Sequence, residues 1–241
     1  MKILRGLYTG YALLVFTILF LLFFWLFLIP IFIPSKYHLV GTFNRWWAWL
    51  MFSAIGMPWK LEYRGVILPH KQYIFCPNHF SYFDIPVMGL NKHNTIFVGK
   101  NDMVNIPMFG FMYQKLHITV DRQNLNSRVN TFKRSLMAID EGKSLVIYPE
   151  GGIITLKDPV MSKFKDGAFR AAIEKQIAIV PVTLPYNWII LPPEEFLLRW
   201  ARVKIIFHEP IETKGMTLQD VEKLKEKVFQ IIESELEQQL A

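Results

Sequence analysis

The stretch NHFSYFD, residues 78–84, places a histidine and an aspartate five residues apart between two apolar runs. A carboxylate that reaches back to an imidazole fixes its tautomer, stabilises its charged form and leaves the other ring nitrogen free as a general base. His79 and Asp84 are therefore candidates for abstracting a proton from a substrate. The structural alternative is that Asp84 caps a helix and His79 is an ordinary turn residue.

A second candidate lies in VIYPEGG, residues 146–152, where a β-like run leads into a proline, a glutamate and two glycines. Glycine lets the backbone come close to a ligand. We expect Glu150 to bind a substrate hydroxyl or to orient His79. The alternative is a plain turn whose glutamate is solvated.

Two basic residues end β-like runs elsewhere in the chain: Lys100 ends NTIFVGK, and Arg122 ends ITVDR. A basic residue at a strand end is a natural phosphate ligand, and arginine can hold a phosphate through two parallel hydrogen bonds. Taken singly, each is more often a solvated surface charge. Each gains weight only beside the other motifs.

Other kinds of site are not indicated. The sequence has no G-x-S-x-G elbow and no H-E-x-x-H, and EGKS at 141–144 lacks the upstream glycine of a phosphate loop. His79 and Asp84 have no third metal ligand nearby, and the single Cys76 excludes a disulfide framework or a thiolate-based metal site. We therefore expect no metal.

The chain is basic, with a formal net charge of +7. Neither an arginine-rich stripe nor a nucleic-acid motif accompanies this charge, so we expect no nucleic-acid partner. A basic protein with an apolar end instead favours contact with an anionic membrane surface.

The N-terminal segment carries no charged residue from 6 to 35. Its apolar run exceeds the roughly 20 residues needed to cross a bilayer, is too long for a signal peptide and lacks a cleavage site. We expect an uncleaved helical anchor that Pro30 and Pro34 break or bend near its end. It either spans the bilayer or dips into one leaflet.

A second apolar segment, residues 37–59, contains charge in its middle, and we expect it to dip into one leaflet. Four of its residues are of the type that sits at a membrane–water interface: Trp46, Trp47, Trp49 and Trp59. The anchoring segment is thus predicted to cover residues 1–60, and a soluble domain residues 61–241.

From about residue 60, β-like and helical patterns alternate, which predicts an α/β fold. A helix is expected to start between Ser81 and Asp84, and another after the capping box formed by Thr217 and Asp220. The β-like runs are 71–77, 94–100, 143–149, 178–184 and 201–210, and helical spacing marks 128–141 and 164–175.

Together these stretches resemble the glycerolipid acyltransferase family. The first family motif, N-H-x-S-x-x-D, is matched in full, and the second motif and two later signatures follow in the expected order. The matching residues are Asn78, His79, Ser81 and Asp84; Lys100, Pro107, Gly110, Asp121 and Arg122; FKDGA at 164–168; and VPV at 180–182.

The third family motif is matched only in part. The family usually has a phenylalanine, Pro-Glu-Gly and then Thr-Arg, whereas this chain has Tyr148 before Pro-Glu-Gly and then Gly152 and Ile153. If the family arginine grips phosphate, either Lys100 and Arg122 suffice, with help from Lys157 or Arg170, or the acceptor is a lyso-lipid without a phosphate monoester.

The resemblance implies a mixed sheet flanked by helices, preceded by a membrane-associated two-helix segment. It implies direct transfer of an acyl chain from acyl-CoA or acyl-carrier protein, without a cofactor, to the hydroxyl of 1-acyl-glycerol-3-phosphate. His79 would act as the base and Asp84 would orient it. The domain would lie on the cytoplasmic face of the membrane.

The resemblance also implies roles for the other motif residues. Lys100 and Arg122 would hold the acceptor's phosphate, and Glu150 and Gly151 would shape the acceptor site. Asn78 and Ser81 are expected at the same site, with Ser81 not a nucleophile.

Two other functional classes remain open. One is a thioesterase or lipase that uses His79 with water, although the missing nucleophile elbow argues against a lipase. The other is a non-catalytic membrane-binding module, against which the intact His79–Asp84 pair argues.

Overall fold

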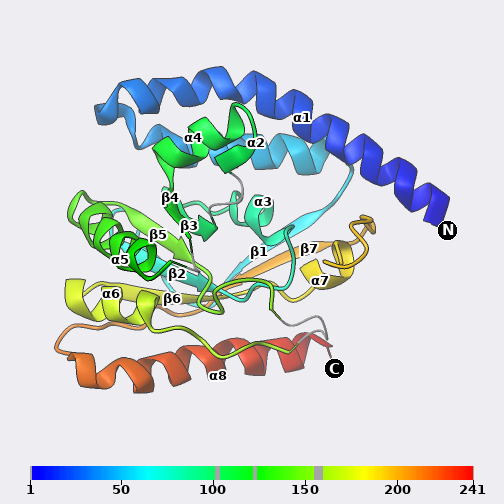
Figure 1. The fold of residues 1–241 in the computed structure, drawn as a ribbon. Coiled ribbons are helices and arrows are strands. Elements are labelled where there is room, and N and C mark those ends of the chain that lie inside the picture. The colour runs from blue at the N-terminus through cyan, green and yellow to red at the C-terminus, as the bar shows by residue number, and fades with distance from the viewer. Residues whose placement is uncertain (1, 101–103, 122–123, 155–159, 241) are drawn as a thin grey trace.

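A computed structural model describes residues 2–100, 104–121, 124–154 and 160–240. The described residues form a seven-stranded sheet with helices on both faces (Figure 1). In sheet order the strands are β1 (Trp59–Tyr63), β7 (Val203–Phe207), β6 (Ala178–Thr183), β2 (Tyr73–Pro77), β5 (Ser144–Ile147), β3 (Thr95–Lys100) and β4 (Ile118–Val120). The predicted α/β fold is confirmed, and each β-like run contains a strand.

Neighbouring strands pair in parallel except β6 with β7, which are antiparallel. Strands β2, β5, β3 and β4 therefore have their carboxyl ends at the same end of the sheet. The pairing brings Phe75 of β2 opposite Val146 of β5 and Val180 of β6. The turns that follow β2 and β5, which carry His79 and Glu150, are thus placed side by side.

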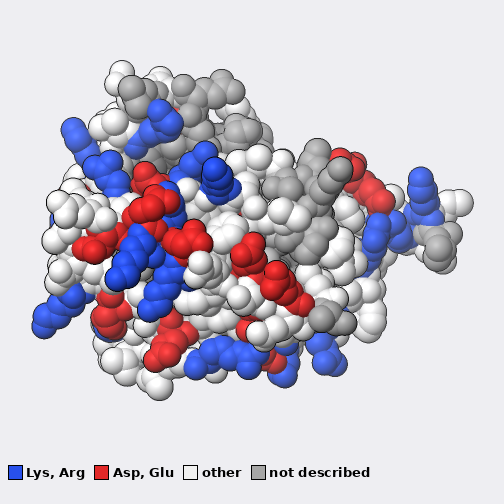
Figure 2. All heavy atoms as spheres, turned by 90° about the horizontal axis from the view of Figure 1, so that it is seen from below, with Lys and Arg blue, Asp and Glu red and all other residues white. Residues whose placement is uncertain are grey.

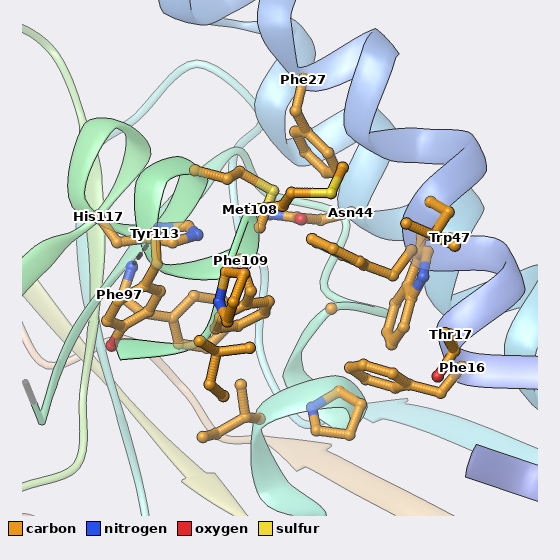
Figure 3. Close-up of a pocket in the computed structure, with 18 of the residues that line it drawn as sticks. Phe16, Thr17, Phe27, Asn44, Trp47, Phe97, Met108, Phe109, Tyr113 and His117 are labelled. Atoms are coloured by element: carbon orange, nitrogen blue, oxygen red, sulfur yellow. Dashed lines mark hydrogen bonds between the residues drawn. The ribbon is translucent and has the colours of Figure 1, made fainter. Parts of the chain in front are cut away.

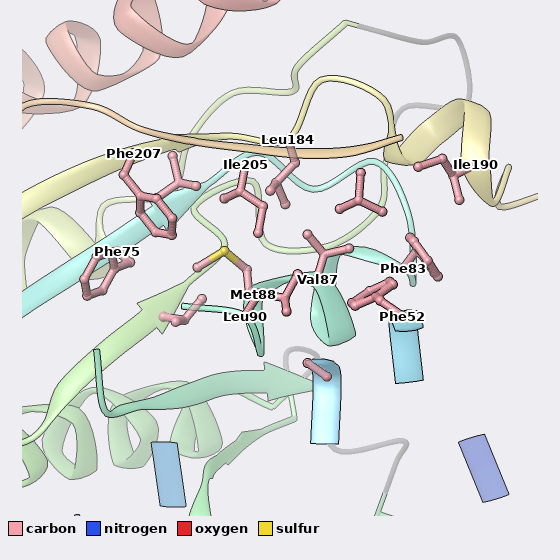
Figure 4. Packing of buried hydrophobic residues seen from close by; sticks show 14 of the residues in the cluster. Phe52, Phe75, Phe83, Val87, Met88, Leu90, Leu184, Ile190, Ile205 and Phe207 are labelled. Carbon is pink, nitrogen blue, oxygen red and sulfur yellow. The ribbon is translucent and has the colours of Figure 1, made fainter. Parts of the chain in front are cut away.

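The central strand β2 is buried along its whole length, which explains its unbroken apolar sequence. Successive side chains of a strand point to opposite faces. Tyr73 and Phe75 belong to the core shown in Figure 4, together with Val87 and Phe207. Ile74 and Cys76 enter a second core on the other face.

Helices cover the two faces of the sheet unequally (Figure 1). One side carries α5 (Leu125–Asp140), α6 (Gly167–Lys175) and α8 (Val221–Leu240), and the other carries α1 (Lys2–Phe32), α2 (Leu39–Ala54), α3 (Asp84–Met88), α4 (Phe109–Leu116) and α7 (Asn187–Ile190). The 3-10 turns Pro34–Lys36 and Leu218–Asp220 precede α2 and α8. The predicted capping box is present before α8.

Helix α1 differs from the others because most of its apolar surface is exposed. Among the described residues it alone is long and apolar enough to cross a membrane, with a mean hydropathy of 3.0 and only 22% of its most apolar stretch buried. It packs on α2 and α4 through an aromatic cluster around Phe24, Phe27 and Phe43. The opposite side of the molecule, seen in Figure 2, intermingles basic and acidic residues.

Two details of the N-terminal prediction can be compared with the structure. Helix α1 continues past Pro30 and ends two residues later at Phe32, so the prolines do mark its end. Trp59, one of the four tryptophans predicted to be interfacial, lies outside the N-terminal helices. Trp59 begins β1 and pairs with Val203.

Candidate active site

The turn between β2 and α3 is fastened at both ends by buried polar side chains. The Asn78 amide is fully buried, accepts a hydrogen bond from Leu184 N at 2.7 Å and donates one to Leu184 O at 3.2 Å. Ser81 Oγ donates to Leu191 O at 2.7 Å and accepts from Phe83 N at 3.0 Å. Both side chains therefore shape the turn that carries His79.

The candidate His–Asp pair is formed. His79 Nδ1 lies 2.9 Å from Asp84 Oδ2. Because a carboxylate only accepts hydrogen bonds, the proton of a neutral His79 sits on Nδ1, and the lone pair of Nε2 is left available as a base.

The carboxylate of Asp84 is itself held in place. It has no exposed surface, and its Oδ2 also accepts from the backbone N–H groups of Phe80 and Ser81 at 2.9 Å each. Its Oδ1 accepts from Asn187 Nδ2, 2.8 Å away on α7. The helix α3 begins at Asp84, within the predicted interval.

Glu150, in the turn after β5, acts on the same turn. Its Oε1 accepts from the backbone N–H of His79 at 2.7 Å, and its Oε2 accepts from Ser162 N at 2.9 Å and Ser162 Oγ at 3.1 Å. Burial raises the pKa of Glu150, and these hydrogen bonds oppose that shift. Glu150 thus orients the backbone at His79 and not its ring. Gly151 follows with a φ of 82°, a conformation that favours glycine.

Tyr148 covers one face of the imidazole. Its ring stacks on His79 with centroids 4.1 Å apart and an interplanar angle of 25°. The stack limits rotation of the imidazole and fixes the plane of its ring. The buried Tyr148 hydroxyl has no hydrogen-bond partner among the described residues.

The predicted phosphate ligands are placed only in part. Lys100 ends β3 in register with Val120 of β4, at the sheet edge that carries the His79 turn, but its side chain is not among the parts that the structure describes. Arg122 and Lys157 lie outside the described residues. The Arg170 guanidinium packs over the Phe132 ring at 5.5 Å, on the α5–α6 side.

A cavity of about 520 Å³ lies between the N-terminal helices and the sheet (Figure 3). Its lining is almost wholly apolar and comes from α1, α2, α3, β3 and α4, with Thr17, Trp47, Phe97 and Phe109 among the residues. Tyr82, Ile85 and Pro86, which belong to or flank the catalytic turn, form another wall. The cavity therefore borders the segment that follows His79 in the chain, although His79 itself is not among the lining residues.

The imidazole of His117 at this cavity is electrically neutral near neutral pH. His117 lines the cavity, and its Nδ1 accepts a hydrogen bond from Phe97 N at 3.3 Å. Burial lowers the pKa of His117 to about 4. The cavity therefore carries no charge from this side chain near neutral pH.

Sequence reasoning missed Asn187 and Ser162 as supporting residues. Asn187 lies 103 residues from Asp84, and Ser162 lies 12 residues beyond Glu150, and no motif marks either one. The sheet topology brings α7 to the turn, whereas Ser162 reaches Glu150 through the segment that follows Glu150.

A family model described as an acyltransferase matches residues 60–185. The chain belongs to the acyltransferase family. The match runs from β1 beyond β6 and includes both the His79–Asp84 turn and the Glu150 turn.

Relatives point to glycerolipid members of the acyltransferase family. The 1-acyl-sn-glycerol-3-phosphate acyltransferase of Haemophilus influenzae is 30% identical over 217 residues, covering 84% of this chain and 85% of the relative. A chloroplastic 1-acyl-sn-glycerol-3-phosphate acyltransferase of Arabidopsis thaliana is 31% identical over 141 residues, or 57% of this chain, which spans 39% of that relative's length. A lyso-ornithine lipid O-acyltransferase of Pseudomonas aeruginosa is 25% identical over 144 residues, covering 60% of this chain and 54% of the relative.

A solved acyltransferase has the same fold. The structure of the 1-acyl-sn-glycerophosphate acyltransferase of Thermotoga maritima matches with a TM-score of 0.81 and 19% identity, covering 100% of this chain and 98% of the other. The resemblance predicted from the motifs is confirmed at the level of family and fold.

Proposed function

We propose that the protein transfers an acyl chain from acyl-CoA or acyl-carrier protein to the free hydroxyl of 1-acyl-glycerol-3-phosphate, making phosphatidic acid for phospholipid synthesis. The observation that carries this proposal is the His79–Asp84 pair at 2.9 Å beside an apolar cavity of about 520 Å³. The names of the relatives from Haemophilus influenzae and Arabidopsis thaliana support it.

The pair supplies the proton transfers of the reaction. Nε2 of His79 takes the proton from the acceptor hydroxyl while its oxygen attacks the thioester carbonyl. The tetrahedral intermediate collapses, the C–S bond breaks, and the imidazolium returns its proton to the leaving thiolate. Asp84 stabilises the imidazolium between these steps, as the aspartate of a Ser-His-Asp triad does, and no acyl-enzyme forms.

The cavity supplies the binding of an acyl chain. Pockets for small ligands commonly have volumes of about 300–1,000 Å³ and mostly apolar linings, and this cavity fits both criteria. Its wall of Tyr82, Ile85 and Pro86 is continuous with the turn that carries His79. An acyl chain bound there has its carboxyl end near the base.

The third motif differs from the usual family sequence, and this difference supports a second candidate class of acceptor. Gly152 and Ile153 replace the residue types that would help to grip a phosphate. The relative from Pseudomonas aeruginosa is named for a lyso-ornithine lipid. The same chemistry on a lyso-lipid without a phosphate monoester is therefore the alternative.

A panel of substrates tests both acceptors. Purified protein in detergent receives labelled acyl-CoA or acyl-carrier protein with lysophosphatidic acid, a lysophospholipid or a lyso-aminolipid. We expect transfer to lysophosphatidic acid to be fastest. Transfer only to the other lyso-lipids selects the alternative, and equal loss of thioester with and without any acceptor contradicts the transferase function.

Anchoring completes the proposal. The exposed apolar surface of α1 supports anchoring of the protein on a bilayer. In this proposal residues 61–241 form the catalytic domain, which lies on the cytoplasmic face. Labelling of the exposed Lys223 by a membrane-impermeant reagent in intact and opened cells tests the orientation. We expect labelling only in opened cells, and labelling in intact cells would place the domain outside.

A further inference from the structure

The loop of residues 191–200 displays aromatic rings to the outside. Phe196 is 56% exposed and Trp200 is 64% exposed. Phe196 also has a φ of 49°, a backbone conformation that is uncommon for residues other than glycine and rare for bulky ones. Such strain persists only where the surrounding structure enforces it, and it is common at functional sites.

The loop is held firmly in this exposed conformation. The carbonyl of Pro192 accepts from the N–H groups of Glu195 and Phe196 at 3.2 Å each, and Arg199 N donates to Ile190 O at 2.7 Å. These bonds close the loop on itself. The exposure of its rings is therefore a feature of an ordered turn.

Further bonds fasten the loop to the first turns of α1. Arg5 Nη2 donates to Glu195 Oε2 at 2.6 Å and to Leu197 O at 2.7 Å, and Leu198 N donates to Thr9 Oγ1 at 2.9 Å. Trp200 Nε1 donates to Gly56 O, just beyond α2, at 2.6 Å. The loop thus sits at the same end of the molecule as the start of α1 and the end of α2.

The other end of the loop is bonded to the catalytic turn. Ser81 Oγ donates to Leu191 O at 2.7 Å. The Tyr82 ring, which lines the apolar cavity, packs on Phe196 with centroids 5.3 Å apart. The loop therefore connects α1 to the turn that carries His79.

The exposed apolar surface continues from this loop onto α1. The first turns of α1 expose Ile3, Leu4 and Leu7, and Tyr11 donates from its hydroxyl to Ala54 O at 2.9 Å while its ring is half exposed. Tyrosine and tryptophan favour the boundary between lipid and water, because the ring is apolar and one end is polar. We call Tyr11, Tyr82, Phe196 and Trp200 the aromatic rim.

We propose that the aromatic rim binds the head-group layer of a lipid bilayer and is a second membrane contact beside the apolar face of α1. Continuity with that face selects a lipid surface over a protein partner. The contact holds the cavity wall at Tyr82 against the bilayer, so that an acceptor lipid reaches His79 without crossing water. This inference rests on the proposed lipid acyltransferase function.

A fluorescent label at the rim tests the contact directly. Cys76 is fully buried, and burial raises the pKa of its thiol, so a thiol reagent labels an introduced cysteine selectively. Phe196→Cys carries an environment-sensitive dye, and Met137→Cys on α5, where the native side chain is 60% exposed, is the matched control. Both are mixed with phosphatidylcholine–phosphatidylglycerol vesicles that contain head-group spin labels.

We expect a blue shift and quenching at position 196 and neither at position 137. No change at 196 while the protein floats with the vesicles overturns the proposal, since α1 alone then makes the contact. A shift at 196 that grows with protein concentration without vesicles also overturns it, because a second copy then covers the rim.

Activity separates this inference from the proposed function. Phe196→Asn and Trp200→Gln together remove both rings, asparagine tolerates the left-handed conformation, and glutamine keeps a donor for Gly56 O. We expect transfer to a vesicle-embedded acceptor to fall about tenfold or more, and transfer in detergent micelles to stay within about twofold. Equal rates on vesicles contradict the rim, whereas a native protein inactive in both assays contradicts the proposed function.

Discussion

Asp84 determines which nitrogen of His79 carries the proton. In Asp84→Asn, the amide NH₂ can donate a hydrogen bond to Nδ1 of His79, which favours the tautomer with its proton on Nε2. Because Nε2 is then no longer available as a base, we expect kcat to fall by about 10³- to 10⁴-fold. Asp140→Asn, on an exposed carboxylate paired with Lys175, is the matched control. Steady-state kinetics measures kcat, and thermal unfolding verifies that each variant is folded. A near-native kcat in Asp84→Asn would falsify the role assigned to Asp84.

The Tyr148 ring stacks on His79, whereas its buried hydroxyl has no hydrogen-bond partner in the part of the chain that the structure describes. An unpaired buried hydroxyl costs about 1–3 kcal/mol, so Tyr148→Phe is expected to raise the free energy of unfolding by about 1 kcal/mol and to keep activity. Tyr148→Ala removes the stack on His79 and is expected to lower kcat. Denaturant unfolding and kinetics measure both variants. Lost activity in Tyr148→Phe would instead show that the hydroxyl contacts a ligand.

His117 makes stability depend on pH. Its pKa is lowered to about 4 in the folded protein by burial, so between about pH 6.5 and 4 the unfolded chain binds a proton that the folded chain does not. Stability is expected to fall by up to about 3 kcal/mol as the pH drops through this range. His117→Asn, which keeps an acceptor for Phe97 N, should shrink that loss.

The control for this prediction is His70→Asn, at an exposed histidine. Unfolding is followed in denaturant at several pH values, and the comparison isolates His117 from His93 and His208, whose pKa values burial also lowers. An unchanged pH slope in His117→Asn refutes the assignment.

The elements that sequence predicts best are those with an unambiguous pattern. β2 and β6 are buried on both faces and read as continuous apolar runs. β1 was missed because WKLEY alternates with charge at the edge of the sheet and follows directly on an apolar segment. Helix α4 was missed because its eight residues are too short for a clear helical period.

In the candidate site, sequence predicts contacts within one turn but not contacts between distant elements. The His79–Asp84 contact was predictable because both residues lie in one turn. The bond from Glu150 to His79 N spans 71 residues, and the bond from Asn187 to Asp84 spans 103 residues, so only the parallel sheet reveals them. The backbone bonds of Asn78 and Ser81, which are predicted as substrate-binding residues, likewise join positions more than 100 residues apart.

Helix α1 is expected to provide the main membrane contact. Leu14→Glu and Leu22→Glu alter side chains that are exposed, so the fold should tolerate them, while each charge costs about 2.5–3.5 kcal/mol in a bilayer core. We expect much less protein to float with vesicles. Val66→Glu, on an exposed loop, is the control, and unchanged flotation of the α1 variant would contradict this role.

At the scale of the whole molecule, the candidate active site lies at the junction of the N-terminal helices and the sheet. The apolar side formed by α1 and α2 is opposite the mixed-charge side covered by α8 (Figures 1 and 2). The apolar cavity and the His79 turn lie between these two sides. This arrangement suits a reaction in which lipid and thioester approach from different environments.

The most direct test of the account is transfer of a labelled acyl chain from acyl-CoA to lysophosphatidic acid in vesicles by the native protein, His79→Ala and the exposed-site control His70→Ala. The account predicts acceptor-dependent product from the native protein and the control, and a rate about 10²- to 10⁴-fold lower in His79→Ala. Product formed by His79→Ala at the native rate would contradict it.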